Sequence, residues 1–408
     1  MVTTSDSLFH RANSRRHCQP GRPRFLDPYS LVPTSYFRVL LISLCGLSIL
    51  TLGCHRRPAP PAPYLAFVVN SQSATLAAVE LAEFRVVASI PVAPSPERVL
   101  ARPGSQELYV VSGAGTISVV AFPELRVVKT LRVGRGARDL AFAPDGRRAF
   151  VLDPTESQIV FLDCEAGKEL ARVRVGASLS GLALTPDGKT LVAAARAANR
   201  LFFVSVESRK TLGSVEVGRG PGPMVILPDS SKVFVADTEE EKISAADVRT
   251  QKLLSHIEIG TRPSALVLKP DAGEVFVLSA QGSNLTILDA FHDNVEQSFP
   301  TGRDPVAGVF RRDSSVFYIA NAGDGSVMAI DFQNRALLAS AHVGTEPRAL
   351  ALTPDERFLV VADSAASSLA VLHADRASLS AGRSALITTI PVGARPVDVV
   401  VPDWLWKP

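Results

Sequence analysis

Arginines gather in the loops that follow a repeated Val-Gly, Ile-Gly or Thr-Gly element, where several of them could converge on one ligand. Guanidinium groups bind carboxylate or phosphate through paired, charge-assisted hydrogen bonds. Seven arginines are spread over six of these loops, namely Arg135, Arg138, Arg219, Arg262, Arg303, Arg348 and Arg395. The sequence therefore predicts a face that binds a small anionic ligand or an acidic partner. The alternative is a set of solvated loop residues, partly paired with Asp139, Asp304, Glu346 and Asp398 on the same loops.

A second set of mostly polar residues recurs at a strand end. Its eight members are Asn70, Ser112, Asp153, Ala195, Asp237, Ser279, Asn321 and Asp363. Asn and Asp oxygens can bind a hard cation, but at strand ends they also cap turns by accepting hydrogen bonds from nearby backbone. We favour turn capping, both here and for Asp163, Asp247, Asp289 and Asp331 at another strand end. The sequence accordingly predicts no metal and no other cofactor.

Short motifs that could indicate catalysis are incomplete in this sequence. Gly188-Lys189-Thr190 resembles the end of a phosphate-binding loop, but position 183 is alanine where that motif requires glycine. The histidines lack the spacing of a metal site. Cys164 follows Asp163 at a strand end without a nearby histidine, and the sequence predicts a structural role for it.

The elements that position these residues belong to one repeated unit. Turn dipeptides or their equivalents begin at positions 103, 144, 186, 228, 270, 312 and 354, so their spacing is 41 or 42 residues. Residues 312–353 illustrate the unit, with strands VFYIAN, SVMAID, ALLASAHV and RALALTP separated by turns. Four short strands per repeat, joined by turns, predict the blade of an all-β propeller.

The two ends of the array predict how the propeller closes. The first unit begins at YLAFVVN, residues 64–70, and lacks a preceding strand, whereas the chain ends with the isolated strand RPVDVVVPD, residues 395–403. Pairing these strands completes one blade and leaves no open sheet edge. Residues 63–402 then form eight blades of about 42 residues, with seven blades and a stray unit as the alternative. Residues 403–408 form a tail whose two tryptophans, at 404 and 406, are expected to cover the closing blade.

The repeats resemble the YVTN family of β-propellers. The matching segments are PDGRRAFVLD, FLDCEAGKELARVRVG, PDERFLVVAD and ITTIPVGARP, and the likeness extends over almost all of residues 63–402. The resemblance implies a propeller fold, with a YncE-like or lactonase-like relationship. Because one such fold hosts many functions, it does not identify an activity.

Residues 1–53 have the features of an export signal. Val39–Leu52 is an uncharged apolar stretch of fourteen residues, which is too short for a membrane span. It is preceded by an arginine-bearing stretch and followed by Gly53-Cys54, which resembles a bacterial lipobox whose cysteine, Cys54, is lipidated. Ordinary signal-peptidase cleavage or retention as an anchor are the alternatives. Residues 54–62 are Pro-rich and are expected to form an extended tether. By resemblance to Gram-negative lipoproteins, His55 favours the outer membrane.

The charge of the globular part disfavours nucleic-acid binding. The whole chain has a net charge of +3, of which residues 1–53 contribute +4, so the remainder carries about −1. We therefore expect a lipid-anchored, extracytoplasmic, non-enzymatic scaffold in the cell envelope that binds an envelope protein or a small anionic ligand. The alternatives are a lactonase-like hydrolase, the propeller part of an envelope redox system, and a surface-layer component.

Overall fold

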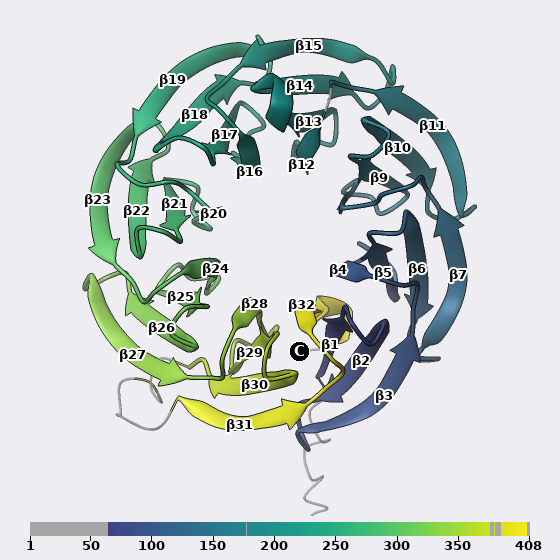
Figure 1. Ribbon diagram of the computed structural model, residues 1–408, viewed down its shortest axis with the longest axis vertical. Coiled ribbons are helices and arrows are strands. Elements are labelled where there is room, and N and C mark those ends of the chain that lie inside the picture. The colour runs from purple at the N-terminus through teal and green to yellow at the C-terminus, as the bar shows by residue number, and fades with distance from the viewer. Residues whose placement is uncertain (1–63, 177, 376–378, 380–384, 406–408) are drawn as a thin grey trace, which may run out of the picture. The chain divides into compact units, whose positions relative to one another are not determined.

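The protein forms a ring of eight four-stranded antiparallel sheets (Figure 1). The computed structural model describes residues 64–405 except 177, 376–378 and 380–384. Blade A consists of β1, β2, β3 and β32, and blades B to H consist of β4–β7, β8–β11, β12–β15, β16–β19, β20–β23, β24–β27 and β28–β31. The predicted eight-bladed propeller is thus confirmed, and the seven-bladed alternative is wrong.

One strand of each blade faces the centre of the ring. These inner strands are β32 (Pro396–Val400), β4 (Pro96–Ala101), β8 (Asp139–Phe142), β12 (Leu179–Leu184), β16 (Pro221–Ile226), β20 (Ala265–Leu268), β24 (Pro305–Phe310) and β28 (Pro347–Leu352). Five of them begin with proline. Proline lacks the N–H that a central strand would donate, and it is tolerated here because an inner strand is a sheet edge.

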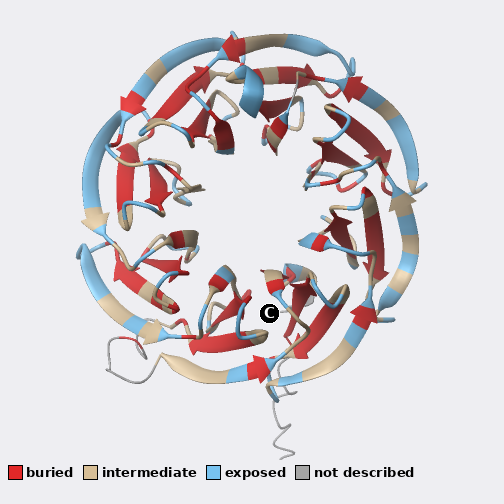
Figure 2. Ribbon diagram, in the orientation of Figure 1, coloured by how far each residue is buried: buried red, intermediate tan, exposed pale blue. Residues whose placement is uncertain are grey.

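The two middle strands of each blade hold the hydrophobic core (Figure 2). The second strands are β1 (Leu65–Asn70), β5 (Glu107–Ser112), β9 (Arg148–Asp153), β13 (Thr190–Ala195), β17 (Lys232–Asp237), β21 (Glu274–Ser279), β25 (Val316–Asn321) and β29 (Phe358–Asp363). The third strands are β2 (Thr75–Glu80), β6 (Thr116–Ala121), β10 (Gln158–Asp163), β14 (Arg200–Ser205), β18 (Lys242–Asp247), β22 (Asn284–Asp289), β26 (Ser326–Asp331) and β30 (Ser368–His373). Both of their faces pack against neighbouring blades, which explains their nearly continuous apolar sequence.

The fourth strand of each blade lies on the outer rim, where exposed and buried residues mix (Figure 2). These strands are β3 (Arg85–Pro91), β7 (Arg126–Arg132), β11 (Lys168–Arg174), β15 (Thr211–Glu216), β19 (Lys252–Glu258), β23 (Asn294–Pro300), β27 (Ala336–His342) and β31 (Leu386–Pro391). In β7 exposed and half-buried residues alternate strictly, as expected where one face of a strand meets water.

The C-terminal strand closes the ring. β32 pairs with β1 so that Val400 lies opposite Phe67 and Val399 lies opposite Val68, which confirms the predicted closure. Beyond it, Trp404 packs against the core between blades A and B, with its ring 5.3 Å from the ring of Phe122. The expected cover over the closing blade is therefore present at Trp404, while position 406 lies outside the described residues.

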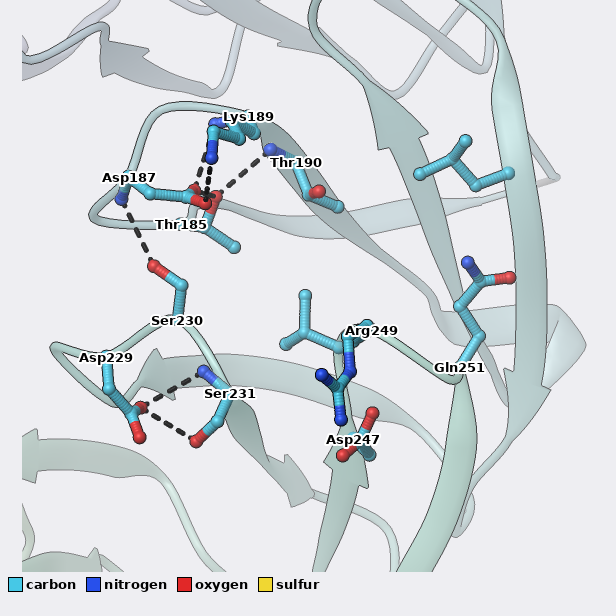
Figure 3. Close-up of a pocket in the computed structure, with 12 residues that line it drawn as sticks. Thr185, Asp187, Lys189, Thr190, Asp229, Ser230, Ser231, Asp247, Arg249 and Gln251 are labelled. Atoms are coloured by element: carbon cyan, nitrogen blue, oxygen red, sulfur yellow. Dashed lines mark hydrogen bonds and ion pairs between the residues drawn. The ribbon is translucent and has the colours of Figure 1, made fainter.

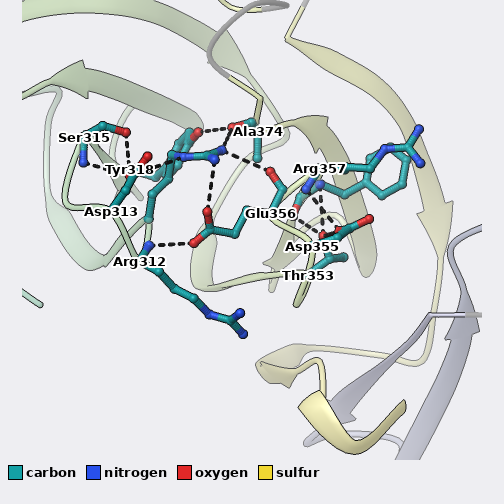
Figure 4. A network of polar contacts seen from close by, with 11 residues as sticks. Arg312, Asp313, Ser315, Tyr318, Thr353, Asp355, Glu356, Arg357 and Ala374 are labelled. Atoms are coloured by element: carbon teal, nitrogen blue, oxygen red, sulfur yellow. Dashed lines mark hydrogen bonds and ion pairs between the residues drawn. The ribbon is translucent and has the colours of Figure 1, made fainter. Parts of the chain in front are cut away.

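Two repeat-equivalent contacts tie neighbouring blades together. The hydroxyl of Tyr318 in blade G donates a 2.7 Å hydrogen bond to the carbonyl of Ala374 in blade H (Figure 4). Arg311 donates to the same carbonyl at 2.7 Å and pairs with Glu356 at 3.0 Å. Between blades B and C, Tyr109 donates to the carbonyl of Cys164 at 3.4 Å in the same way.

Helical structure among the described residues is confined to short segments, including the 3-10 turns η1 (Arg196–Ala198) and η2 (Asp403–Leu405). None of the helices in this part of the chain is long and apolar enough to span a membrane. The predicted signal, Cys54 and the tether lie outside the described residues.

Candidate functional site

Two kinds of loop meet at one end of the ring, which we call the mouth face. These are the loops that enter the inner strands and the loops that connect second and third strands. Thr238 N donates to Gly220 O at 3.1 Å, and Ala322 N donates to Asp304 O at 2.8 Å. The Pro-Asp turns lie at the opposite end, the turn face, where they contact the turns between third and fourth strands; Val206 N, for example, donates to Lys189 O at 2.9 Å.

In five blades, the Asn or Asp that ends the second strand lies beneath the glycine of a mouth loop: Asn70, Asp153, Asp237, Asn321 and Asp363 lie beneath Gly393, Gly134, Gly218, Gly302 and Gly344. A Cβ atom built on Gly218 would collide with the carboxylate of Asp237, and one built on Gly302 would lie 2.7 Å from Asn321 Cγ. The repeated glycine and the repeated Asn or Asp therefore pack directly against each other. This explains their recurrence without a ligand.

Hydrogen bonds of two of these residues match the predicted turn capping. Asp153 Oδ1 accepts hydrogen bonds from Thr155 N at 3.1 Å and Glu156 N at 3.2 Å. Asp363 Oδ1 accepts from Glu346 N at 3.1 Å and Ala366 N at 2.8 Å. Across the described residues, no three His, Cys, Asp or Glu side chains are grouped so that they could share a metal ion.

Three of the seven predicted arginines form repeat-equivalent ion pairs with acidic residues of the adjoining mouth loop. Arg219 Nε lies 2.8 Å from Glu240 Oε1, Arg303 Nε lies 2.6 Å from Asp324 Oδ1, and Arg135 Nε lies 3.4 Å from Glu156 Oε1. Each acid stands three residues after the polar strand end of its blade. Each of these arginines connects two mouth loops through its ion pair, and the neighbouring acid balances its positive charge.

Of the other four arginines, one forms an ion pair with a described residue and three do not. Arg348 pairs with Glu346 on its own loop, as the sequence suggested. Asp139, in contrast, pairs with Arg98 of blade B, so the expected pairing on its own loop is wrong. Among the described residues, no ion pair involves the exposed Arg138, Arg262 or Arg395.

Charged residues of the inner strands lie in only one half of the ring. They are Arg348 on β28, Asp398 on β32, Glu97 and Arg98 on β4, and Asp139 on β8, and we call them the charged half-ring. The inner strands β12, β16, β20 and β24 contain no charged residue. All five residues stand near the strand starts, at the mouth end, because the inner strands run from the mouth face to the turn face.

Three members of the charged half-ring connect consecutive blades. Asp398 of blade A accepts a 2.9 Å hydrogen bond from Val99 N of blade B. Arg98 of blade B then forms an ion pair with Asp139 of blade C. Burial raises the pKa of Asp398 to about 6, opposed by the amide of Val99 and the charge of Arg98. Burial also raises the pKa of Asp139, against the opposing effect of Arg98.

Sequence reasoning had treated Asp139 and Asp398 only as partners of loop arginines and had missed Arg98. The signal that could have revealed them is their position. Arg98, Asp139 and Asp398 occupy the same place in the repeat, where blades F, G and H carry alanine.

Blade E contains a buried chain of polar side chains just below the mouth face. Ser244 Oγ lies 2.6 Å from Asp237 Oδ2 and 2.9 Å from His256 Nδ1, and Gly218 N donates to Ser244 Oγ at 3.1 Å. Asp237 and Ser244 are fully buried, whereas His256 is exposed. Burial raises the pKa of Asp237 to about 7, while the hydrogen bond from Ser244 opposes that rise. Because Ser244 is inaccessible, this chain is not a nucleophile site.

A pocket of about 530 Å³ opens where blades A and B meet at the mouth face. It is lined by Ser71, Gln72, Ser95, Pro96, Glu97, Arg395 and Val397. Its residues come from both ends of the chain, because β32 and β1 share one sheet. The pocket holds one member of the charged half-ring and one predicted arginine.

A second pocket, of about 480 Å³, lies on the turn face between blades D and E (Figure 3). Three carboxylates line it, but each is held by its own turn. Asp187 accepts from Thr185 Oγ1 at 2.6 Å, Asp229 from Ser231 Oγ at 2.7 Å, and Asp247 from Thr250 N at 2.6 Å. These hydrogen bonds contribute to lowering the pKa of all three carboxyls. The carboxylates therefore serve to shape the turns.

Comparison with known proteins supports the β-propeller superfamily. Residues 120–258, about a third of the chain, match the family described as lactonase, 7-bladed beta-propeller. This segment runs from β6 to the end of β19 and contains the complete blades C, D and E. No curated protein matches the sequence.

Solved structures share the fold at low identity. The dihydro-heme d1 dehydrogenase NirN, in complex with DHE, superposes with a TM-score of 0.70 at 16% identity over 85% of this chain and 76% of that one. A functionally unknown protein from Desulfotomaculum acetoxidans gives a TM-score of 0.57 at 16% identity, over 73% and 99% of the two chains. Hydrazine synthase of Kuenenia stuttgartiensis gives 0.51 at 16%, over 64% and 87%. These likenesses show the fold alone.

Proposed function

We propose that the protein is a lipid-anchored, extracytoplasmic binding module that holds a ligand or partner of the cell envelope at the mouth face, around blades A, B and C. The observation that carries this proposal is the charged half-ring. Repetition would place the same residue on every inner strand, yet charges occupy only four consecutive blades. Such asymmetry gives the mouth a defined orientation toward whatever it binds.

The exposed charges of this region are suited to recognition. Glu97, Arg138 and Arg395 are exposed and are free of ion pairs within the described residues. Exposed charged groups without an ion pair can match the charges of a partner and fix the register of an interface. The ion-paired arginines, which are Arg135, Arg219, Arg303 and Arg348, lack this freedom, so they support binding less than the sequence suggested.

The test is native mass spectrometry of the full-length protein, extracted from its own envelope in gentle detergent. The triple variant E97Q/R138Q/R395Q is compared with E124Q/R147Q/K189Q, which changes one acid and two bases on the turn face. We expect a co-purifying ligand or protein to be lost from the mouth variant and retained by the turn-face variant. Equal retention by both variants would overturn the proposal, as would a species that carries no bound partner and no lipid.

A lactonase-like hydrolase is the second candidate, supported by the family match over residues 120–258. A carboxyl whose pKa lies near the working pH can serve as a general acid or base, and Asp398 meets this condition. The test is hydrolysis of glucono-δ-lactone followed by base uptake in a pH-stat. Activity that D398N abolishes would favour the enzyme, and no activity above background would remove it.

A further inference from the structure

The pocket between blades A and B carries one carboxylate and one guanidinium that do not neutralise each other. Glu97 and Arg395 both line it, and no ion pair joins them or any other described residue to either one. Elsewhere on the mouth face, arginines such as Arg219 and Arg303 are paired with an acid. Two opposite charges that line one pocket without pairing with each other are available to a ligand.

Glu97 is placed by its strand and by a glycine beside it. It is the second residue of β4, and its Oε1 lies 2.6 Å from the position that a Cβ atom would take on Gly113. The loop that contains Gly113 is itself held to the loop before β4, because Gly113 N donates to Ser95 O at 2.9 Å. A side chain at position 113 would therefore displace the carboxylate.

Arg395 is placed by its backbone. Its carbonyl accepts hydrogen bonds from Ser71 N at 2.9 Å and from Ser71 Oγ at 3.0 Å. Its φ of 54° is left-handed. These contacts hold the backbone of Arg395, an exposed residue that lines the pocket.

The remaining lining matches a small amphipathic molecule. Val397 and Pro96 supply apolar surface, while Ser71, Gln72 and Ser95 supply hydrogen-bonding groups. The volume of about 530 Å³ falls in the range of small-molecule sites, which is roughly 300–1,000 Å³.

We propose that this pocket binds a zwitterionic small molecule of the α-amino acid class, with its carboxylate on Arg395, its ammonium group on Glu97 and its side chain against Val397. Guanidinium and carboxylate groups match in geometry and bind in paired hydrogen bonds, and an ammonium donates three hydrogen bonds to acceptors such as a carboxylate. This inference rests on the proposed binding function and names its ligand.

The test uses the full-length protein in detergent and mixtures of the common free amino acids, screened by saturation-transfer NMR. The best binder is then compared by calorimetry with its N-acetyl derivative, which lacks the positive charge, and its amide, which lacks the negative charge. We expect each derivative to bind at least about tenfold more weakly, since each lacks one of the two charges that form charge-assisted hydrogen bonds with the pocket.

Single variants assign the two charges. E97Q is expected to weaken binding of the free amino acid about tenfold while leaving binding of the N-acetyl derivative unchanged. R395Q is expected to weaken binding of the free amino acid about tenfold while leaving binding of the amide unchanged. R262Q is the matched control, because Arg262 is exposed and occupies the equivalent loop position before β20. Circular dichroism checks that each variant is folded.

The inference is overturned if no amino acid binds, if the blocked derivatives bind as tightly as the free form, or if R262Q acts like R395Q. Failure of the screen, together with envelope co-purification that still depends on Glu97 and Arg395, would show that the ligand class is wrong while the binding function stands. Failure of both experiments would remove the function as well.

Discussion

The carboxylate of Asp237 occupies the space that any side chain at Gly218 would need. Asp237 cannot move away easily, because it is buried and its Oδ2 accepts a 2.6 Å hydrogen bond from Ser244. We therefore expect Gly218→Ala to lower the free energy of unfolding by about 1–3 kcal/mol, the usual cost of overpacking. Gly273→Ala is the control, since a Cβ there meets only Asp271 Oδ1 at 3.6 Å. Urea denaturation measures both, and an equal effect would show that the contact is unimportant.

The ion pair between Arg98 and Asp139 connects blades B and C, and Asp139 is only 20% exposed. Partial burial strengthens such a pair relative to an exposed one. A double-mutant cycle with R98A and D139A should give a coupling energy of about 1 kcal/mol. The matched cycle at Arg135 and Glu156, whose side chains are 82% and 37% exposed, should give less than about 0.5 kcal/mol. Similar values for both cycles would contradict the assigned role.

Stability should fall as the pH rises from about 5 to 7, because the carboxyls with lowered pKa values are already ionised in both the folded and the unfolded chain over this interval. Asp398 and Asp237 have pKa values raised to about 6 and about 7, while a carboxyl in the unfolded chain titrates near 3.9. The folded state thus binds more protons across this interval, and the linkage makes unfolding easier at the higher pH. In D398N, which mimics the protonated form, the loss between pH 4.5 and 7.5 should be smaller by about 1–3 kcal/mol. An unchanged pH profile in urea titrations would refute this assignment.

Cys164 should be unreactive in the folded protein. It is a buried free thiol within the core between blades B and C, and burial raises its pKa. Since the thiolate is the reactive form, we expect labelling by a thiol reagent to be slower by a factor of about 100 or more in native buffer than in denaturant. The experiment uses the variant C18S/C45S/C54S, in which Cys164 is the only cysteine of the chain. Rapid native labelling would falsify the structural role.

Lipidation at Cys54 predicts a change of location. In C54S, the protein should lose its diacylglyceryl mass adduct and pass from the membrane fraction to the soluble fraction after cell breakage. Stable anchoring needs more than one acyl chain, and C54S loses both chains of the diacylglyceryl group. Nearly all of the protein should therefore leave the membrane fraction. Membrane retention of C54S without lipid would instead favour an uncleaved signal anchor.

The repeat period, the number of blades and the closure of the ring follow from the amino-acid sequence alone. Local rules suffice for them: turns recur at a fixed spacing, strands are short and apolar, and an isolated strand at each end needs a partner. The capping role assigned to Asp153 and Asp363 also follows, because both accept hydrogen bonds from backbone amides two or three residues further along the chain.

Which charges remain free was decided by tertiary structure. Arg219 and Glu240 are 21 residues apart in the sequence and meet because two loops of blade E lie side by side. Arg98 pairs with Asp139, 41 residues away, because the ring brings equivalent positions of adjacent blades together. Asp398 reaches Val99 across 299 residues, since closure joins the two ends of the chain. Linear spacing does not show which of these side chains pair. The sequence therefore predicted seven arginines as one binding face, where the fold formed a half-ring of charge and a pocket between blades A and B.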